Sequence, residues 1–206
     1  MLKIWGRTNS INVQKVMWTA GELGLKYERI DAGGAFGRNR DPDYLALNPN
    51  GLVPTIEDDG VVVWESNACV RYLAAKYGEG TLWPRDPGVR ARADMWMDWK
   101  LSTVIPVLVP VFKELIRTPP EQRDMKAVAA AQANLTDAMR LFDAYMAGRA
   151  YVAGDSLTIG DIAMGAATYR YLALPMERPK LPNLEAYYER LKTRPAYAEH
   201  VMLPLS

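Results

Sequence analysis

The sequence predicts two domains of different class: an α/β domain with a mixed four-stranded sheet, followed by an all-helical bundle domain. Three observations support this prediction. Strand-like and helix-like segments alternate in the first part of the chain, residues 80–87 have the Gly and Pro content of a linker, and beyond them apolar residues recur only with the helical period. We therefore expect domains at residues 1–79 and 88–206.

The first domain opens with a short apolar run at residues 2–5, which predicts a buried strand. From Ser10 onward apolar residues follow helical spacing, and Gly24 is placed to end that helix. Residues 27–31 form a second predicted strand, followed by a Gly-rich loop and a short turn at residues 41–47. These elements make one βαβ unit, whose two strands should be parallel because they are joined by a crossover.

A hairpin comes next. Residues 53–57 and 61–64 are rich in β-forming residues and are separated by an Asp-Asp-Gly turn sequence. A helix over residues 66–77 completes the domain. The hairpin must be antiparallel, so the sheet is mixed and has helices on both faces. This order of elements is the thioredoxin-like arrangement.

The rest of the chain predicts helices only, at residues 88–117, 120–147, 158–174 and 184–193. Pro106 and Pro110 fall inside the first of these, where each removes a backbone donor, so we expect a bent or broken helix. Thr158 and Asp161 have the spacing of an N-terminal capping box, which is a folding motif.

Composition excludes several classes of function. A formal net charge of +1 does not provide the basic face that a nucleic-acid partner requires. The chain contains no apolar stretch near the ~20 residues of a membrane span and no signal-peptide core at its start. A single cysteine forms no intramolecular disulfide and suits a reducing compartment. We expect a cytoplasmic protein with no nucleic-acid or membrane partner.

Common catalytic and metal motifs are missing. His200 and Cys69 are the only residues of their types, so a His/Cys metal site has no ligand set and we expect no metal. The sequence has neither the G-x-S-x-G of a serine hydrolase nor the C-x-x-C of a dithiol oxidoreductase. Cys69 lies on the apolar side of its helix, and we expect it in the core.

The most specific signal is the run NPNGLVPTI at residues 48–56, followed by WESN at residues 64–67. These segments resemble the glutathione-binding signature of glutathione transferases, and the resemblance extends over essentially the whole chain. The run WGRTNSINVQKV near the start looks like a bacterial subgroup related to the beta, theta and nu types. The resemblance implies glutathione as co-substrate, a cis Val53–Pro54 bond, and pairing of the Val53 backbone with the cysteinyl part of glutathione.

Glu65 and Ser66 lie where a strand leads into a helix, and a helix N-terminus favours a carboxylate. The resemblance places the γ-glutamyl carboxylate of glutathione on Ser66 and its ammonium near Glu65; the competing interpretation of Ser66 is a plain helix cap. Arg40 corresponds to a loop position that is often basic near the glycyl carboxylate, although Arg38 and Asn39 are close candidates and a solvated loop is an alternative.

Two residues are candidates for stabilising the thiolate. Ser10 matches the spacing of the catalytic serine in serine-type transferases, and Asn12 matches an asparagine of the nu type and related enzymes. The Ser10 hydroxyl, the Asn12 amide and the helix N-terminus all remain open, as does a capping role alone. Lowering a thiol pKa of about 8.5 by ~2 units requires about 2.7 kcal/mol, which one or two donors and a helix dipole can provide.

The expected activity is conjugation of the glutathione thiolate to small electrophiles, as in detoxification. The alternatives are glutathione-dependent disulfide reduction and a non-catalytic carrier of hydrophobic ligands. The resemblance also implies a homodimer. Helical spacing on the proline-bent helix suggests an apolar electrophile pocket without a cation of its own, walled by Ile105, Val109, Phe112 and Tyr169, although a core role is the competing interpretation.

Overall fold

The computed structural model describes residues 1–206, which form two compact units. One unit comprises Met1–Arg85 with Pro195–Leu203, and the other comprises Asp86–Arg194 with Pro204–Ser206. The division after Arg85 lies within the linker expected from the sequence. Residues 195–203, which the sequence analysis assigned to the helical domain, pack instead with the first unit.

A four-stranded sheet of order β2-β1-β3-β4 forms the centre of the first unit. Strand β1 pairs in parallel with β2 and antiparallel with β3, and β3 pairs antiparallel with β4. The strands are β1 (Leu2–Trp5), β2 (Tyr27–Ile30), β3 (Thr55–Asp58) and β4 (Val61–Trp64). The mixed sheet predicted from the sequence is confirmed.

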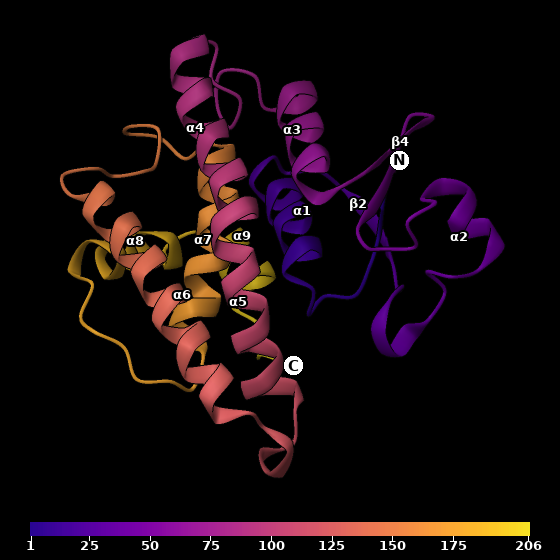
Figure 1. The fold of residues 1–206 in the computed structure, drawn as a ribbon. Coiled ribbons are helices and arrows are strands. Elements are labelled where there is room, and N and C mark those ends of the chain that lie inside the picture. Colours follow the sequence, from indigo (N-terminus) through magenta and orange to yellow (C-terminus); the bar gives the residue numbers. More distant parts are fainter. The chain divides into compact units, whose positions relative to one another are not determined.

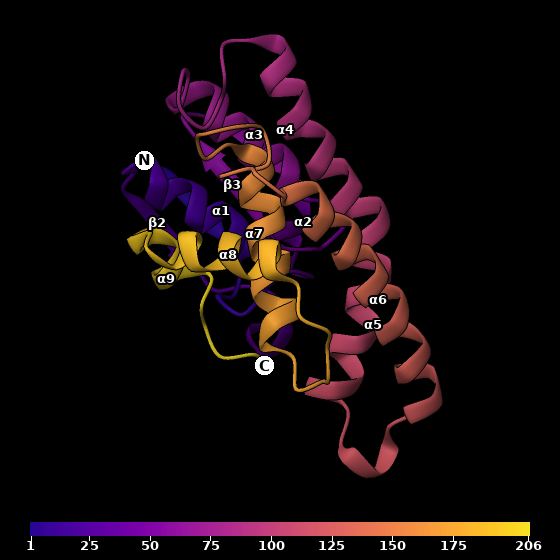
Figure 2. The same ribbon diagram turned by 90° about the vertical axis from the view of Figure 1, so that its left-hand side faces the viewer.

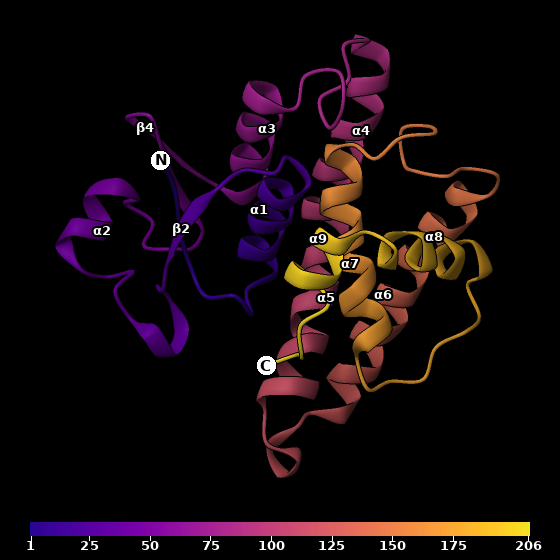
Figure 3. The same cartoon turned by 180° about the vertical axis from the view of Figure 1, so that it is seen from behind.

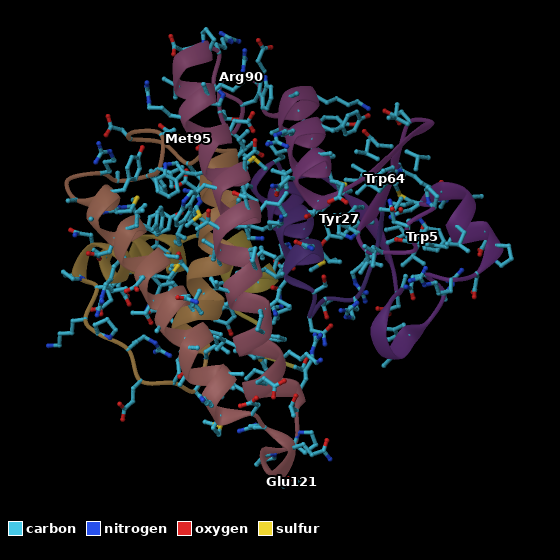
Figure 4. All side chains as sticks on the ribbon, in the orientation of Figure 1. Trp5, Tyr27, Trp64, Arg90, Met95 and Glu121 are labelled. Atoms are coloured by element: carbon cyan, nitrogen blue, oxygen red, sulfur yellow. The ribbon has the colours of Figure 1, made fainter.

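Helices cover both faces of this sheet. Helices α1 (Ile11–Glu22) and α3 (Ser66–Tyr77) lie together on one face, and the short helix α2 (Pro42–Leu47) lies on the other (Figures 1 and 3). Trp5, which is labelled in Figure 4, packs edge-on against Tyr44 of α2, and the ring centroids are 5.7 Å apart. On the other face the fully buried Ile4 and Ile56 contribute to the core.

The β3–β4 hairpin has the backbone that its sequence predicts. Asp59 and Gly60 both have positive φ, 50° and 83°, as required at the centre of a type I′ turn. The sequence analysis did not foresee that Asp58 ties this hairpin to α3. Its buried carboxylate accepts hydrogen bonds from Tyr72, Lys76 and Tyr77 of that helix, and these lower its pKa although burial alone would raise it.

The last helix, α9 (Pro195–His200), packs on α1 and explains why the end of the chain belongs to the first unit. The rings of Tyr197 and Trp18 lie 4.7 Å apart. A Cβ built on Gly21 would come within 2.9 Å of the Cβ of Ala196, so the small residues let the two helices approach closely. Helix α9 was not among the helices predicted from the sequence.

The second unit is all helical, as predicted (Figure 2). Helix α7 contacts α4, and α6 contacts both α5 and α8. The helices are α4 (Pro87–Trp99), α5 (Ile105–Phe112), α6 (Met125–Met146), α7 (Ile159–Ala173) and α8 (Pro182–Lys192). Helix α6 begins later than predicted because Asp124 caps it, accepting hydrogen bonds from the N–H groups of Lys126 and Ala127.

The chain stays helical through Pro106 and Pro110, so the expected break is instead a change of hydrogen-bond pattern. π-Helical turns at Lys100–Val104 and Lys113–Arg117 flank α5 on either side. A proline cannot donate to the carbonyl four residues back, and wider turns next to the prolines accommodate the missing bonds.

The capping box at the start of α7 is confirmed and extends further than predicted. The buried Asp161 carboxylate accepts hydrogen bonds from Thr158 N–H and Oγ1, and also from Val152 N–H and Tyr187 Oη. Near α7, Trp96 is 4% exposed and packs on Phe142 at 5.0 Å. Trp96 is thus a core residue.

No helix combines the length and apolar character needed to cross a membrane. No group of three or more His, Cys, Asp or Glu side chains is arranged to hold a metal ion.

Candidate functional site

The first unit contains a pocket where three separate segments meet. They are the start of α1, the loop that leads into β3, and the start of α3. Its lining residues are Asn12, Asn48, Asn50, Leu52, Val53, Pro54, Glu65 and Ser66. Five of the residues singled out in the sequence therefore lie together: Asn12, Val53, Pro54, Glu65 and Ser66. Ser10 and Arg40 do not line the pocket.

Side chains of α2 and of the residue that follows it hold the loop before β3 by hydrogen bonds. The Leu52 carbonyl accepts hydrogen bonds from Tyr44 Oη at 2.5 Å and from Asn48 Nδ2 at 2.8 Å. Asn48 Nδ2 also donates to Thr55 Oγ1 at 3.1 Å. None of these bonds involves the backbone of Val53, and its N–H and C=O have no hydrogen-bond partner within the chain. Since open backbone groups pair readily with a peptide, Val53 is suited to bind one.

The Val53–Pro54 peptide bond is cis, as the resemblance implies. The sequence analysis did not identify Asn48, Asn50 and Leu52 as pocket residues, although all three lie in the NPNGLVP run that it singled out.

Glu65 has an unusual backbone conformation at the turn from β4 into α3. Its φ of 67° lies in the left-handed region that non-glycine residues rarely adopt. Such a conformation persists only where the surrounding structure enforces it, and it is common at ligand sites. The turn places Glu65 at the N-cap position of α3 and Ser66, 6% exposed, at its first helical position.

This placement bears on the two interpretations of Ser66. The N-cap residue is Glu65, whose side chain makes no capping hydrogen bond. The interpretation of Ser66 as a plain N-cap is therefore wrong. Its hydroxyl and N–H lie at the positive end of a 12-residue helix, an arrangement that favours a bound carboxylate.

Ser10 and Asn12 occupy different places at the start of α1. Ser10 is the N-cap residue by its backbone, is 9% exposed, and its side chain makes no capping bond. Asn12 lies in the first turn, is partly exposed, and lines the pocket. The structure thus brings Asn12 next to Glu65 and Ser66 but leaves Ser10 outside the lining residues.

The three candidates in the Gly-rich loop also separate. Arg40 is exposed, and its Nη1 donates to the carbonyl of Asn50, a pocket residue, at 3.4 Å. Arg38 instead stacks over Trp5, with its Cζ 5.1 Å from the ring centroid. Asn39 donates to the carbonyl of Gly51 at 2.7 Å and so supports the loop. Arg40 is the one whose guanidinium contacts a lining residue.

Cys69 is fully buried in α3, as expected. Its Sγ donates to the carbonyl of Val63 at 3.4 Å, and burial raises its pKa to about 12. A thiol that stays protonated at neutral pH is a poor nucleophile, so Cys69 is not a reactive group.

The predicted electrophile residues differ in exposure. Val109 of α5 is 49% exposed, whereas Phe112 is 5% exposed. The guanidinium groups of Arg170 and Arg117 lie 4.3 Å and 4.9 Å from the centroid of the Phe112 ring. Folding thus brings two arginines onto the Phe112 ring, and the apolar pocket wall expected from the sequence stays a prediction. Ile105 and Tyr169 are partly buried, and burial raises the pKa of the Tyr169 hydroxyl.

A thioredoxin-like unit with this pocket, followed by a helical unit, characterises one family. The model described as "Glutathione S-transferase, N-terminal domain" matches residues 1–75, and "Glutathione S-transferase, C-terminal domain" matches residues 101–195. The chain is 44% identical to the Escherichia coli K12 protein "Glutathione S-transferase GstB", with 100% of both chains covered. The chain belongs to the glutathione S-transferase family.

Other relatives agree. "Glutathione S-transferase 3" of Zea mays is 30% identical, covering 97% of this chain and 93% of its own. A solved theta class glutathione S-transferase from the citrus canker pathogen Xanthomonas axonopodis pv. citri, with glutathione bound, superposes with a TM-score of 0.96. It is 47% identical, with 100% of this chain and 99% of the other covered. The resemblance found in the sequence is confirmed.

Proposed function

We propose that this chain binds glutathione in the pocket of the first unit and transfers its thiolate to small electrophiles. The observation that carries the proposal is the meeting of open Val53 backbone groups with two helix N-termini in one pocket. A tripeptide with an anionic end and a thiol needs these features: a backbone to pair with, a carboxylate site, and donors for the thiolate.

Each part of glutathione has a partner. The γ-glutamyl carboxylate binds the N–H and hydroxyl of Ser66, and Glu65 attracts the neighbouring ammonium. The cysteinyl backbone pairs with Val53, next to Pro54. Arg40, which contacts the pocket residue Asn50, attracts the glycyl carboxylate.

The thiolate is stabilised by the first turn of α1. Asn12 is the primary donor because it lines the pocket, and Ser10 assists from the N-cap position. No general base is required, since lowering a thiol pKa of about 8.5 by ~2 units takes about 2.7 kcal/mol. The pH dependence of kcat/KM tests this order. Asn12→Ala raises the apparent thiol pKa more than Ser10→Ala does, and the reverse result assigns the role to Ser10.

Binding is tested by calorimetry with glutathione. Ser66→Ala removes a hydrogen bond to a charged group, about 1.5–3 kcal/mol, and so weakens glutathione by at least several-fold. Ser156→Ala is the matched control, because Ser156 is exposed and lies in the other unit. Unchanged affinity in Ser66→Ala contradicts the assigned site.

The placement of Asn12 in the pocket also supports a second candidate, exchange of glutathione with small disulfides. Turnover of a generic aryl halide compared with hydroxyethyl disulfide separates the two reactions. Glutathione binding with turnover of neither substrate supports the carrier alternative.

The protein acts as a cytoplasmic homodimer. On β4, Val62 and Trp64 point to the same face and are 41% and 38% exposed, so they form an apolar patch of the kind that interfaces cover (Figure 4 labels Trp64). Sedimentation should give about twice the 23.1 kDa chain mass. A monomer at micromolar concentration contradicts the dimer, and Trp64→Glu, which places a charge in the patch, should produce one.

A further inference from the structure

A buried lysine lies one helical turn after the pocket residue Asn12. Lys15 of α1 is 1% exposed, although a charged side chain is rarely buried unless it is paired. Its Nζ donates a hydrogen bond to Asn67 Oδ1 at 2.7 Å. Asn67 is itself only 6% exposed and immediately follows Ser66. The bond thus joins two helices of the same unit at a buried point.

Both ends of this bond are close to pocket residues in the chain. Asn12 lies one helical turn before Lys15 on α1, and Ser66 precedes Asn67 at the start of α3. The strained backbone of Glu65 lies two residues before Asn67. Strain of this kind requires enforcement by neighbouring structure. A hydrogen bond that anchors the first turn of α3 to α1 supplies it.

The charge of Lys15 has a separate effect. Its field reaches α3, where it lowers the pKa of Cys69 against the larger effect of burial. In a low-dielectric interior such a charge acts over several ångströms with little screening. It therefore adds to the positive end of the α3 dipole on the side where Ser66 offers its N–H and hydroxyl.

We propose that Lys15 is a positioning residue for glutathione: bonded to Asn67, its buried ammonium holds the Glu65–Ser66 turn and adds positive charge behind the carboxylate end of the pocket. This inference rests on the proposed glutathione site. It assigns Lys15 no contact with the reacting sulfur.

The test compares glutathione affinity and steady-state kinetics across four variants. Lys15→Met removes the charge and the bond, and Lys15→Arg keeps a cation. Asn67→Asp keeps a partner for the ammonium but cancels its charge. Thr19→Val is the matched control: Thr19 is fully buried on the same helix and donates to the Lys15 carbonyl at 2.8 Å, so its loss destabilises α1 without altering the Lys15 charge.

Lys15→Met is expected to raise the Kd and KM for glutathione on the order of tenfold, the size of a lost charge-assisted interaction, and to change kcat for an aryl halide much less. Lys15→Arg recovers part of the affinity. Asn67→Asp lowers the affinity for glutathione more than it lowers the affinity for an analogue whose γ-glutamyl α-carboxylate is amidated. The reason is that only glutathione carries the negative charge that Lys15 favours. Thr19→Val retains wild-type affinity.

Two results overturn the proposal. In the first, Lys15→Met binds glutathione as tightly as the wild type. In the second, Thr19→Val loses as much affinity as Lys15→Met at a matched loss of melting temperature, which reduces Lys15 to a structural role. If Lys15→Met does not fold, the wild type and Asn67→Asp are compared by how strongly each prefers glutathione over the amidated analogue. If the two proteins show the same preference, the proposal for Lys15 is overturned. The proposed glutathione site is refuted by different results: the wild type does not bind glutathione, or Ser66→Ala binds it as tightly as the wild type does.

Discussion

Replacing Asp161 by Asn should destabilise the helical unit strongly although the two side chains have the same shape. Asp161 is fully buried, and each of its oxygens accepts one backbone and one hydroxyl hydrogen bond. Oδ1 accepts from Val152 N–H at 2.9 Å and Tyr187 Oη at 3.1 Å. Oδ2 accepts from Thr158 N–H at 2.8 Å and Thr158 Oγ1 at 3.0 Å.

An amide replaces one of these oxygens with an NH₂ group. The hydroxyl at that position can rotate and accept, but the backbone N–H cannot, so one buried donor stays unsatisfied at a cost of about 1–3 kcal/mol. The hydrogen bonds at the remaining oxygen are also no longer made to a charged group, and each is weakened by about 1 kcal/mol. Because burial raises the pKa of the Asp161 carboxyl, the relief from burying a charge offsets the weakening of these bonds, and the unsatisfied donor leaves a net loss of about 1–3 kcal/mol.

Urea unfolding, followed by tryptophan fluorescence at one protein concentration, measures this loss. Burial raises the pKa of the Asp161 carboxyl to about 6, so the assay at about pH 8 keeps it ionised. With an m-value of about 2 kcal/mol/M, the midpoint should fall by about 0.5–1.5 M.

Asp143→Asn is the control for this prediction. Asp143 is only partly buried and accepts from Leu184 N–H at 2.8 Å at the start of α8. Asn is as good as Asp in such a capping role, so the control should lose less than about 1 kcal/mol. Equal midpoint shifts for Asp161→Asn and Asp143→Asn would refute the argument from buried donors.

Three further outcomes are expected. Cys69 should resist alkylation in the native protein and react only after unfolding, because it is buried with a pKa raised to about 12; rapid labelling in native buffer would contradict this. Burial lowers the pKa of His200 below 6.5, with Glu199 opposing it, so the unfolded chain gains a proton first and stability falls as the pH drops below about 6.5. His200→Gln should flatten this part of the curve of midpoint against pH, and an unchanged slope would exclude His200 as its source. Val109→Arg should raise the KM for an aryl halide and leave glutathione affinity intact, since Val109 is 49% exposed; a loss of melting temperature alone would make Val109 a packing residue.

Much of the glutathione site could be predicted because its parts are local in sequence. The Asp-Asp-Gly turn determines a hairpin whose register pairs Thr55 with Trp64. That register places Pro54, just before one strand, opposite Glu65, just after the other. Two motifs that look separate along the chain are therefore neighbours as soon as the hairpin forms, and no distant contact is required to unite them.

The directions of two strand pairs were predictable for a similar reason, whereas the pairing of β1 with β3 was not predicted. A short βαβ unit must be parallel and a tight hairpin antiparallel, so local connections leave few arrangements for the sheet. The same holds for the capping box of α7, whose Thr158 and Asp161 are three residues apart and satisfy each other within one helical turn.

Other features depended on contacts between residues far apart in the chain. The sequence left Ser10 and Asn12 as equal candidates, and only the packing of α1 beside α3 placed Asn12 in the pocket. The same packing buries Lys15 against Asn67, 52 residues away. Periodicity shows that a residue lies on a helix but not which partner that helix faces, so neither result could be derived from spacing alone.

The amino-acid sequence by itself therefore determined the sheet, the hairpin, the helical second half and the motif residues of the pocket, since each depends on nearby residues and on backbone rules. Only the tertiary structure decided that α9 returns to pack on α1, that Phe112 is buried under the Arg170 guanidinium, and that the wide turns beside Pro106 keep the chain helical. These outcomes follow from which surfaces exclude water together, and that choice is made by the whole fold and not by any one segment.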